Sequence, residues 1–211
     1  MNDSIRFTLT GDGPSDRVLL YPLSWILRRR LRARITTQPL WADLRPLRDK
    51  PKGLAQRIQA ALELYPCDLL FVHRDAETAT PADRIKEISE ATAELGVTLP
   101  VVCVVPVRMT EAWLLFDERA VRLAAGNPNG RTPLPIPFPD PETIADPKRV
   151  LHEALRLASG LSGRRLKNFS ASGAVHRVAE YIEDFSPLLA LPAFKRLEND
   201  LARVLHDRGW D

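Results

Sequence analysis

Along the first half of the chain, the spacing of the apolar residues changes repeatedly between the alternation of a strand and the spacing of a helix. Residues 5–10 alternate one by one, which predicts a strand, and residues 15–31 carry apolar side chains at helical spacing. The same switch recurs downstream. We predict further strands at 35–40, 68–73 and 99–105, and further helices at 54–64, 82–95 and 109–116. Strands that alternate with helices favour an α/β fold with a mostly parallel sheet flanked by helices.

Two of these strands are apolar without interruption. Leu69 to Val72 and Val101 to Val105 contain no charged residue, which predicts burial on both faces of the sheet. Pro22 lies inside the helix predicted for residues 15–31. A proline there removes one backbone hydrogen bond, so we expect this helix to bend.

The pattern changes near Gly126. Seven prolines between Pro128 and Pro147 predict an extended connection. Asp146 and Pro147 then suit the N-cap and first position of a new helix. We therefore predict an α/β domain over residues 1–125, a proline-rich connection over 126–147, and a helical extension over 148–211 that packs on the same domain.

Composition narrows the class of protein only slightly. With 45% hydrophobic and 27% charged residues, the 211-residue chain falls in the globular range. No apolar run approaches the roughly 18 residues of a membrane span, so we expect no membrane partner. The first residues lead directly into a strand and do not resemble a signal peptide, which favours a cytoplasmic location. Cys67 and Cys103 lie in or beside apolar runs and suit buried free thiols.

Arginines are concentrated near the start of the chain. Six of them precede the first acid after Asp16, which is Asp43; they are Arg17, Arg28, Arg29, Arg30, Arg32 and Arg34. Such a cluster suits either a polyanion or a solvated helix end. A second basic group, Arg164, Arg165 and Lys167, lies among glycines and serines and is a candidate for anion contact.

Three acidic clusters follow predicted strands. Asp12 and Asp16 come after the first, Asp75 and Glu77 after a buried strand, and Glu111 after the next. Because the carboxyl ends of parallel strands meet at one edge of a sheet, these acids are expected to converge there.

A divalent metal site is the simplest use of such a cluster. Asp75 and Glu77 are one residue apart, so in extended backbone both carboxylates point to one side and can share Mg²⁺ or Mn²⁺. Asp12, between Gly11 and Gly13, is expected to complete the site. Asp16 either reaches the same site or caps the following helix. The chain lacks the glycine-rich dinucleotide fingerprint and the P-loop.

Other residues near this edge have two possible roles each. Asp12 or Glu111 is the candidate for proton transfer. His73 shares a strand face with Asp75 and is either an accessory residue or a hydrogen-bonded structural one. Arg74 and Arg108 either contact a phosphate or pair with the neighbouring acids.

These motifs resemble the Toprim fold of topoisomerases, primases and OLD-type nucleases, which has a glutamate after its first strand and a DxD pair after its third. Asp12 stands in place of that glutamate, and Asp75 and Glu77 in place of the pair. The resemblance implies proton transfer or metal binding for Asp12, and magnesium binding for Asp75 and Glu77. The phrases GDGPSDRVLL, CDLLFVHRDAE, VPVRMTEAWLLFDE, AAGNPNG and DPKRVL are similar to the Toprim-related bacterial family called domain of unknown function 4276.

The function predicted from this is divalent-metal-dependent phosphodiester hydrolysis, by a nuclease in defence or nucleic-acid maintenance. The alternative is a catalytically silent Toprim-like module that binds nucleic acid or a partner ATPase. A third possibility is a small-nucleotide phosphohydrolase.

Overall fold

The computed structural model describes residues 4–76, 78–136 and 140–211. Four strands form one sheet in the order β2-β1-β3-β4. All three pairings in it are parallel, which confirms the predicted α/β class with a parallel sheet. The strands are β1 (Ser4–Thr10), β2 (Thr36–Trp41), β3 (Leu69–His73) and β4 (Val101–Val104).

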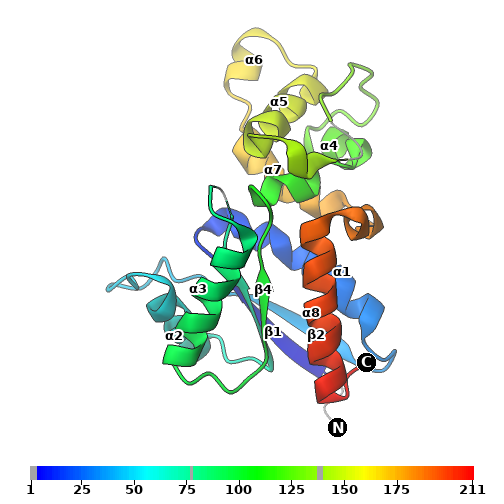
Figure 1. Cartoon of the computed structure of the whole chain (residues 1–211). Coiled ribbons are helices and arrows are strands. Elements are labelled where there is room, and N and C mark those ends of the chain that lie inside the picture. Colours follow the sequence, from blue (N-terminus) through cyan, green and yellow to red (C-terminus); the bar gives the residue numbers. More distant parts are fainter. Residues whose placement is uncertain (1–3, 77, 137–139) are drawn as a thin grey trace.

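Helices cover both faces of the sheet (Figure 1). On one face lie α1 (Leu20–Arg30) and α8 (Pro192–Arg208), and on the other lie α2 (Leu54–Leu64) and α3 (Pro81–Glu94). The alternation within the strands sorts side chains between these layers. Phe7 and Phe71 face the first layer and meet edge to face, with ring centroids 5.4 Å apart. Leu70 and Val72 face the second layer.

The remaining helices gather beyond the carboxyl ends of the strands, at the top of Figure 1. They are α4 (Glu118–Ala124), α5 (Pro147–Ser159), α6 (Gly163–Lys167) and α7 (Ala171–Tyr181). One apolar core runs from the sheet into them, since Phe7, Trp113, Leu155 and Val178 belong to the same buried cluster. The bounds predicted for the domain, the connection and the extension stay predictions.

Several helix boundaries follow local rules. The side chain of Asp146 accepts a hydrogen bond from the backbone N–H of Arg149, and Pro147 occupies the first turn, as predicted. Pro22 was predicted to lie inside one long helix, but it lies near the start of a shorter one. Residues 15–31 divide into a 3-10 helix, η1 (Pro14–Leu19), and α1, so Pro22 stands in the first turn of α1, where its missing N–H leaves no hydrogen bond unmade.

One other predicted helix is shorter than expected. Residues 109–116 form only the 3-10 helix η2 (Thr110–Leu114) before α4 begins. Near the end of the chain, Pro192 starts α8 after the 3-10 helix η4 (Ser186–Ala190). A further short 3-10 helix, η3 (Pro141–Thr143), precedes α5.

None of the described helices combines the length and apolarity that a membrane span needs. Cys67 and Cys103 are free thiols, and both are half-buried rather than fully buried.

Candidate functional site

The order of the strands reverses between β1 and β3, and we call the position beyond the carboxyl ends of these two strands the crevice. The chain passes from β1 outward to β2 on one side, and then returns to β3 on the other side. In open parallel sheets, ligands bind beyond the carboxyl ends of the strands at such a reversal. The pairings of Thr10 with Val72 and of His73 with Val104 set the ends of β1, β3 and β4 side by side.

Asp16 is the buried acid after β1. The residue is 5% exposed, and its Oδ2 accepts hydrogen bonds from the backbone N–H groups of Asp12 (2.8 Å) and Gly13 (3.0 Å). The hydroxyl of Ser15 donates to Oδ1 of Asp16 (3.2 Å). Gly11 leaves room for this arrangement, because a Cβ atom there would stand 2.6 Å from Oδ2 of Asp16. Asp16 thus organises the loop after β1, and its Oδ2 lies 3.8 Å from Nε2 of His73 at the end of β3.

His73, at the end of β3, lies at the centre of the buried polar groups. It is 1% exposed, and its Nδ1 lies 3.0 Å from the carbonyl oxygen of Val104, to which Nδ1–H donates. Its Nε2 approaches Oδ1 of Asp75 (3.4 Å), the hydroxyl of Thr110 (3.3 Å) and Oδ2 of Asp16 (3.8 Å).

Two opposing effects set the pKa of His73. Burial alone lowers it, but the hydrogen bond to Asp75, the charges of Asp16 and Asp75 and the Val104 carbonyl outweigh burial and raise the pKa of His73 above its usual value. The imidazolium form is therefore favoured between the two carboxylates.

Asp75 is fixed by the segment that follows β4. Its Oδ1 accepts hydrogen bonds from the backbone N–H of Thr110 (3.0 Å) and from the Thr110 hydroxyl (3.4 Å). The side chain remains 25% exposed. Sequence reasoning did not single out Thr110, although a hydroxyl residue beside Glu111, at the start of a turn after a strand, is a capping signal.

Asp12 is exposed at the mouth of the crevice and is held by arginines. It forms ion pairs with Arg57 and, at 3.4 Å, with Nε of Arg74. Arg57 also donates to the carbonyl of Gly11 (3.3 Å), and Arg74 pairs with Glu87 (3.2 Å). Of the two roles predicted for Arg74, pairing with a neighbouring acid is therefore observed.

Glu111 is a buried acid on the other side of the centre. It is 8% exposed, and burial raises its pKa, with smaller contributions from the charges of Asp75 and Asp16. A backbone hydrogen bond within Glu111 and the charge of Lys148 act in the opposite direction. The carboxyl group of Glu111 thus retains its proton to higher pH than an exposed glutamate does.

Glu111 lines a pocket of about 290 Å³ between the sheet edge and the helices beyond it. We call this the helix pocket. Its wall on the sheet side includes Ser15 and Glu111, while α5 and α7 close the other side. Its lining residues are Pro14, Ser15, Val18, Glu111, Lys148, His152, Ser172, Val175 and His176. Sequence reasoning missed Lys148, His152 and His176, because no local pattern relates them to the acids.

The predicted basic residues do not gather at one place. Arg108 is exposed in the loop between β4 and η2, at the same edge as the acids, and Arg164 and Arg165 are exposed on α6. The arginines at the end of α1 lie just before β2, at the opposite edge of the sheet. There, Arg30 pairs with Glu198 and Arg32 donates to the carbonyl of Asp211, so this cluster helps to attach the C-terminal helix.

The predicted metal site is only partly described. Glu77 lies outside the described residues. Among residues 4–76, 78–136 and 140–211, no three histidine, cysteine, aspartate or glutamate side chains are positioned to hold a metal ion together. The acids that the fold does bring together around His73 are Asp16 and Asp75.

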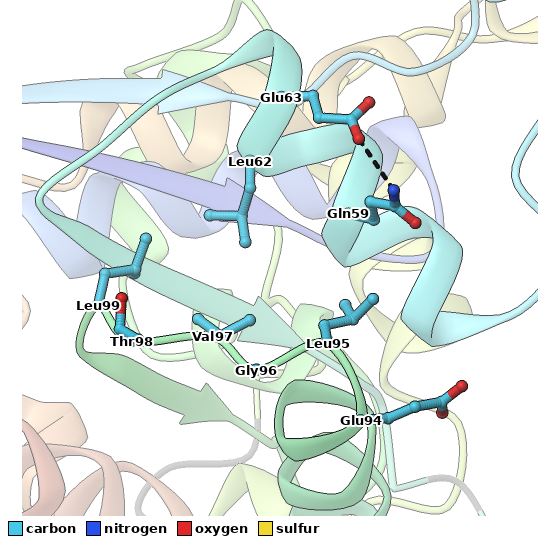
Figure 2. Close-up of a pocket in the computed structure, with 9 residues that line it drawn as sticks. All are labelled: Gln59, Leu62, Glu63, Glu94, Leu95, Gly96, Val97, Thr98 and Leu99. Carbon is cyan, nitrogen blue, oxygen red and sulfur yellow. Dashed lines mark hydrogen bonds between the residues drawn. The ribbon is translucent and has the colours of Figure 1, made fainter.

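Two more pockets lie among the described residues. One of about 160 Å³ lies at the ends of β1 and β2 and is lined by Asp12, Trp41 and Arg57, so it borders the loop that Asp16 organises. The larger, of about 580 Å³, lies at the amino-terminal edge of the strands between α2 and the loop after α3 (Figure 2). It is lined by Leu62, Leu95 and Val97, with Gln59 and Glu63 hydrogen-bonded at its rim (2.9 Å). Neither pocket contains the buried acids.

No protein-family model, no curated protein and no solved structure matches this chain.

Proposed function

We propose that the protein is a divalent-metal-dependent phosphodiesterase, acting as a nuclease at the crevice between β1 and β3. One observation carries this proposal. Asp16 and Asp75, which follow two neighbouring parallel strands, approach the same imidazole nitrogen of His73 to 3.8 and 3.4 Å. Buried acids at a reversal of strand order are where α/β proteins bind charged ligands.

The donor atoms suit magnesium or manganese. Both ions take oxygen ligands, and magnesium commonly uses one or two protein carboxylates, with water and substrate phosphate oxygens completing the shell. Asp75, with a side chain 25% exposed, is the better placed of the two acids, and Asp16 is the second. When bound, the metal orients the phosphate and activates a water molecule. Asp12 and Glu77 stay predicted ligands.

The chain's own residues have separate tasks in this proposal. Thr110 and His73 hold the Asp75 carboxylate in place through hydrogen bonds to Oδ1. Glu111, whose pKa is raised by burial, carries a proton that it gives to the leaving oxygen. Arg74, with a side chain 15% exposed, pairs with the exposed Asp12 and supplies a positive charge that attracts a phosphodiester.

A catalytically silent Toprim-like module, binding nucleic acid or a partner ATPase, is the second candidate. The pairing of Asp12 with Arg57 and Arg74 favours it, because this acid is already neutralised by two guanidinium groups. In this alternative, the acids stabilise the loops and no metal is needed.

Replacing Asp75 by Asn distinguishes the two candidates. Manganese affinity, measured by isothermal titration, and cleavage of a single-stranded oligonucleotide should both fall, cleavage by roughly 100-fold or more. Asp207→Asn is the control, because it makes the same chemical change on the exposed end of α8. If the wild-type protein neither binds manganese nor cleaves the oligonucleotide, the silent module is the correct reading. Cleavage of mononucleotides alone would point to a small-nucleotide phosphohydrolase.

A further inference from the structure

The helix pocket lies next to both acids of the proposed centre. Its lining residue Ser15 donates a hydrogen bond to Asp16, and Glu111 directly follows Thr110, which donates to Asp75. A ligand in the pocket is therefore separated from Asp16 by Ser15, and from Asp75 by Glu111 and Thr110.

Two helices each contribute a pair of polar side chains to the pocket, with the same spacing along the helix. Lys148 and His152 are four residues apart on α5, and Ser172 and His176 are four residues apart on α7, so each pair shares one helix face. Lys148 and Ser172 also stand in the first turns of their helices, where backbone N–H groups add positive potential. Lys148 is exposed and forms no ion pair with any described residue.

Both histidines are partly withdrawn from water, and cations lie near them. Burial is the main cause that lowers the pKa of His152, and the charges of Lys148 and Arg156 lower it further, against the opposing charge of Asp146. Burial is also the main cause that lowers the pKa of His176, with Arg17 acting in the same direction and Glu180 against it. Lys148, which lines the pocket without an ion-pair partner among the described residues, is the group that favours an anionic ligand there.

We propose that the helix pocket binds a second phosphate group of the substrate, next to the phosphodiester that is cleaved. Lys148 supplies the charge, and Ser172, His152 and His176 supply hydrogen bonds. This inference rests on the proposed hydrolysis for the identity of the ligand. It makes the C-terminal helices part of the substrate site and explains why α5 and α7 close over the carboxyl edge of the sheet.

Inorganic phosphate tests the binding step without any hydrolysis. In NMR titrations of the imidazole protons, phosphate should raise the pKa of His152 and of His176 by roughly half a unit, with saturation. His206, whose side chain is 81% exposed on α8, is the internal control, and chloride at matched ionic strength controls for screening. Lys148→Ala should weaken phosphate affinity roughly tenfold. Arg149→Ala, an exposed neighbour that pairs with Asp146 and Glu153 instead, should leave it unchanged.

Three substrates distinguish which phosphate of a nucleic acid the helix pocket binds. A dinucleotide with one internal phosphate gives the reference effect of Lys148→Ala on cleavage itself, because the charge of Lys148 also acts on the pKa of Glu111. The same dinucleotide with an added terminal phosphate, and a longer single strand, should each show a roughly tenfold higher KM in the variant. An effect on the terminally phosphorylated dinucleotide alone would identify an end phosphate as the ligand, and an effect on the longer strand alone would identify the backbone.

Histidine signals that do not respond to phosphate, in a protein that hydrolyses the substrates, would overturn this inference and leave the proposed function intact. Saturable phosphate binding without hydrolysis of any substrate would overturn the proposed function, and would leave the pocket as an anion site.

Discussion

Nε2 of His73 lies 3.4 Å from Oδ1 of Asp75 and 3.8 Å from Oδ2 of Asp16, two acids that follow the ends of β3 and β1. The imidazole is 1% exposed, and its other nitrogen donates to the carbonyl of Val104. The ring therefore connects β3 to β4 through Nδ1 and to the acids through Nε2. This contact links the stability of the fold to the charge of the candidate site.

The contact predicts how stability depends on pH. Because the pKa of His73 is raised in the folded protein, its contribution is complete below the unfolded pKa of about 6.5 and is lost as pH rises through the higher folded value. Urea unfolding in metal-free buffer from pH 5.5 to 9 should show this loss in the wild type. In His73→Asn, which keeps a donor near Val104, the decline should be smaller. Equal pH dependence in the two proteins would mean that His73 does not carry the effect.

Gly11 and Gly13 provide a matched pair of substitutions. Gly11→Ala places a Cβ atom 2.6 Å from Oδ2 of Asp16, so the carboxylate must move, at a cost of about 1 to 3 kcal/mol in the free energy of unfolding. At Gly13 the nearest atom is Oγ of Ser15, at 3.8 Å, so Gly13→Ala should be tolerated. Thermal melts of the two variants and the wild type measure the loss of stability in each case. A similar loss in the two variants would contradict the close packing of Asp16 against Gly11.

Glu111→Gln should separate stability from activity. Burial raises the pKa of Glu111, so its ionised form destabilises the fold at pH values above the folded pKa. The neutral glutamine removes this effect, and the melting temperature at pH 8 should rise or stay unchanged. If Glu111 donates the proton, hydrolysis should fall roughly 100-fold, and the decline of the wild-type rate with rising pH should disappear. A variant with full activity would remove Glu111 from the mechanism.

The arginines near the end of α1 should have a structural effect. Arg30 pairs with Glu198 and Arg32 contacts Asp211, at the sheet edge opposite the acids. Replacing Arg28, Arg29, Arg30 and Arg32 together by Ala should leave the salt dependence of oligonucleotide binding unchanged and reduce stability only modestly. Arg108→Ala, at the same edge as the acids, should flatten that dependence by nearly one log unit if it contacts a phosphate. If the four-arginine variant flattened the salt dependence and Arg108→Ala left it unchanged, nucleic acid would bind at the amino-terminal edge of the strands.

Local pattern in the sequence determined the fold class and the edge where the acids lie. Periodicity alone predicted the helix Leu54–Leu64 and the buried strand Leu69–His73, and the capping residues predicted the start of α5 at Pro147. These features depend on neighbours a few residues apart, which a sequence displays directly. The position of Asp12, Asp75 and Glu111 after strands follows from the same pattern.

Only the tertiary structure decided what each acid does. Asp12 and Asp16 are four residues apart in one loop, yet Asp12 is exposed and paired with Arg57 and Arg74, while Asp16 is buried beside His73. Lys148 and His176 line the same pocket as Glu111, although their helices lie far along the chain. Burial and ion pairing depend on which distant segments pack together. The hydrophobic packing that brings these segments together is determined by the whole core, whereas periodicity and capping are determined by residues that are close in the sequence.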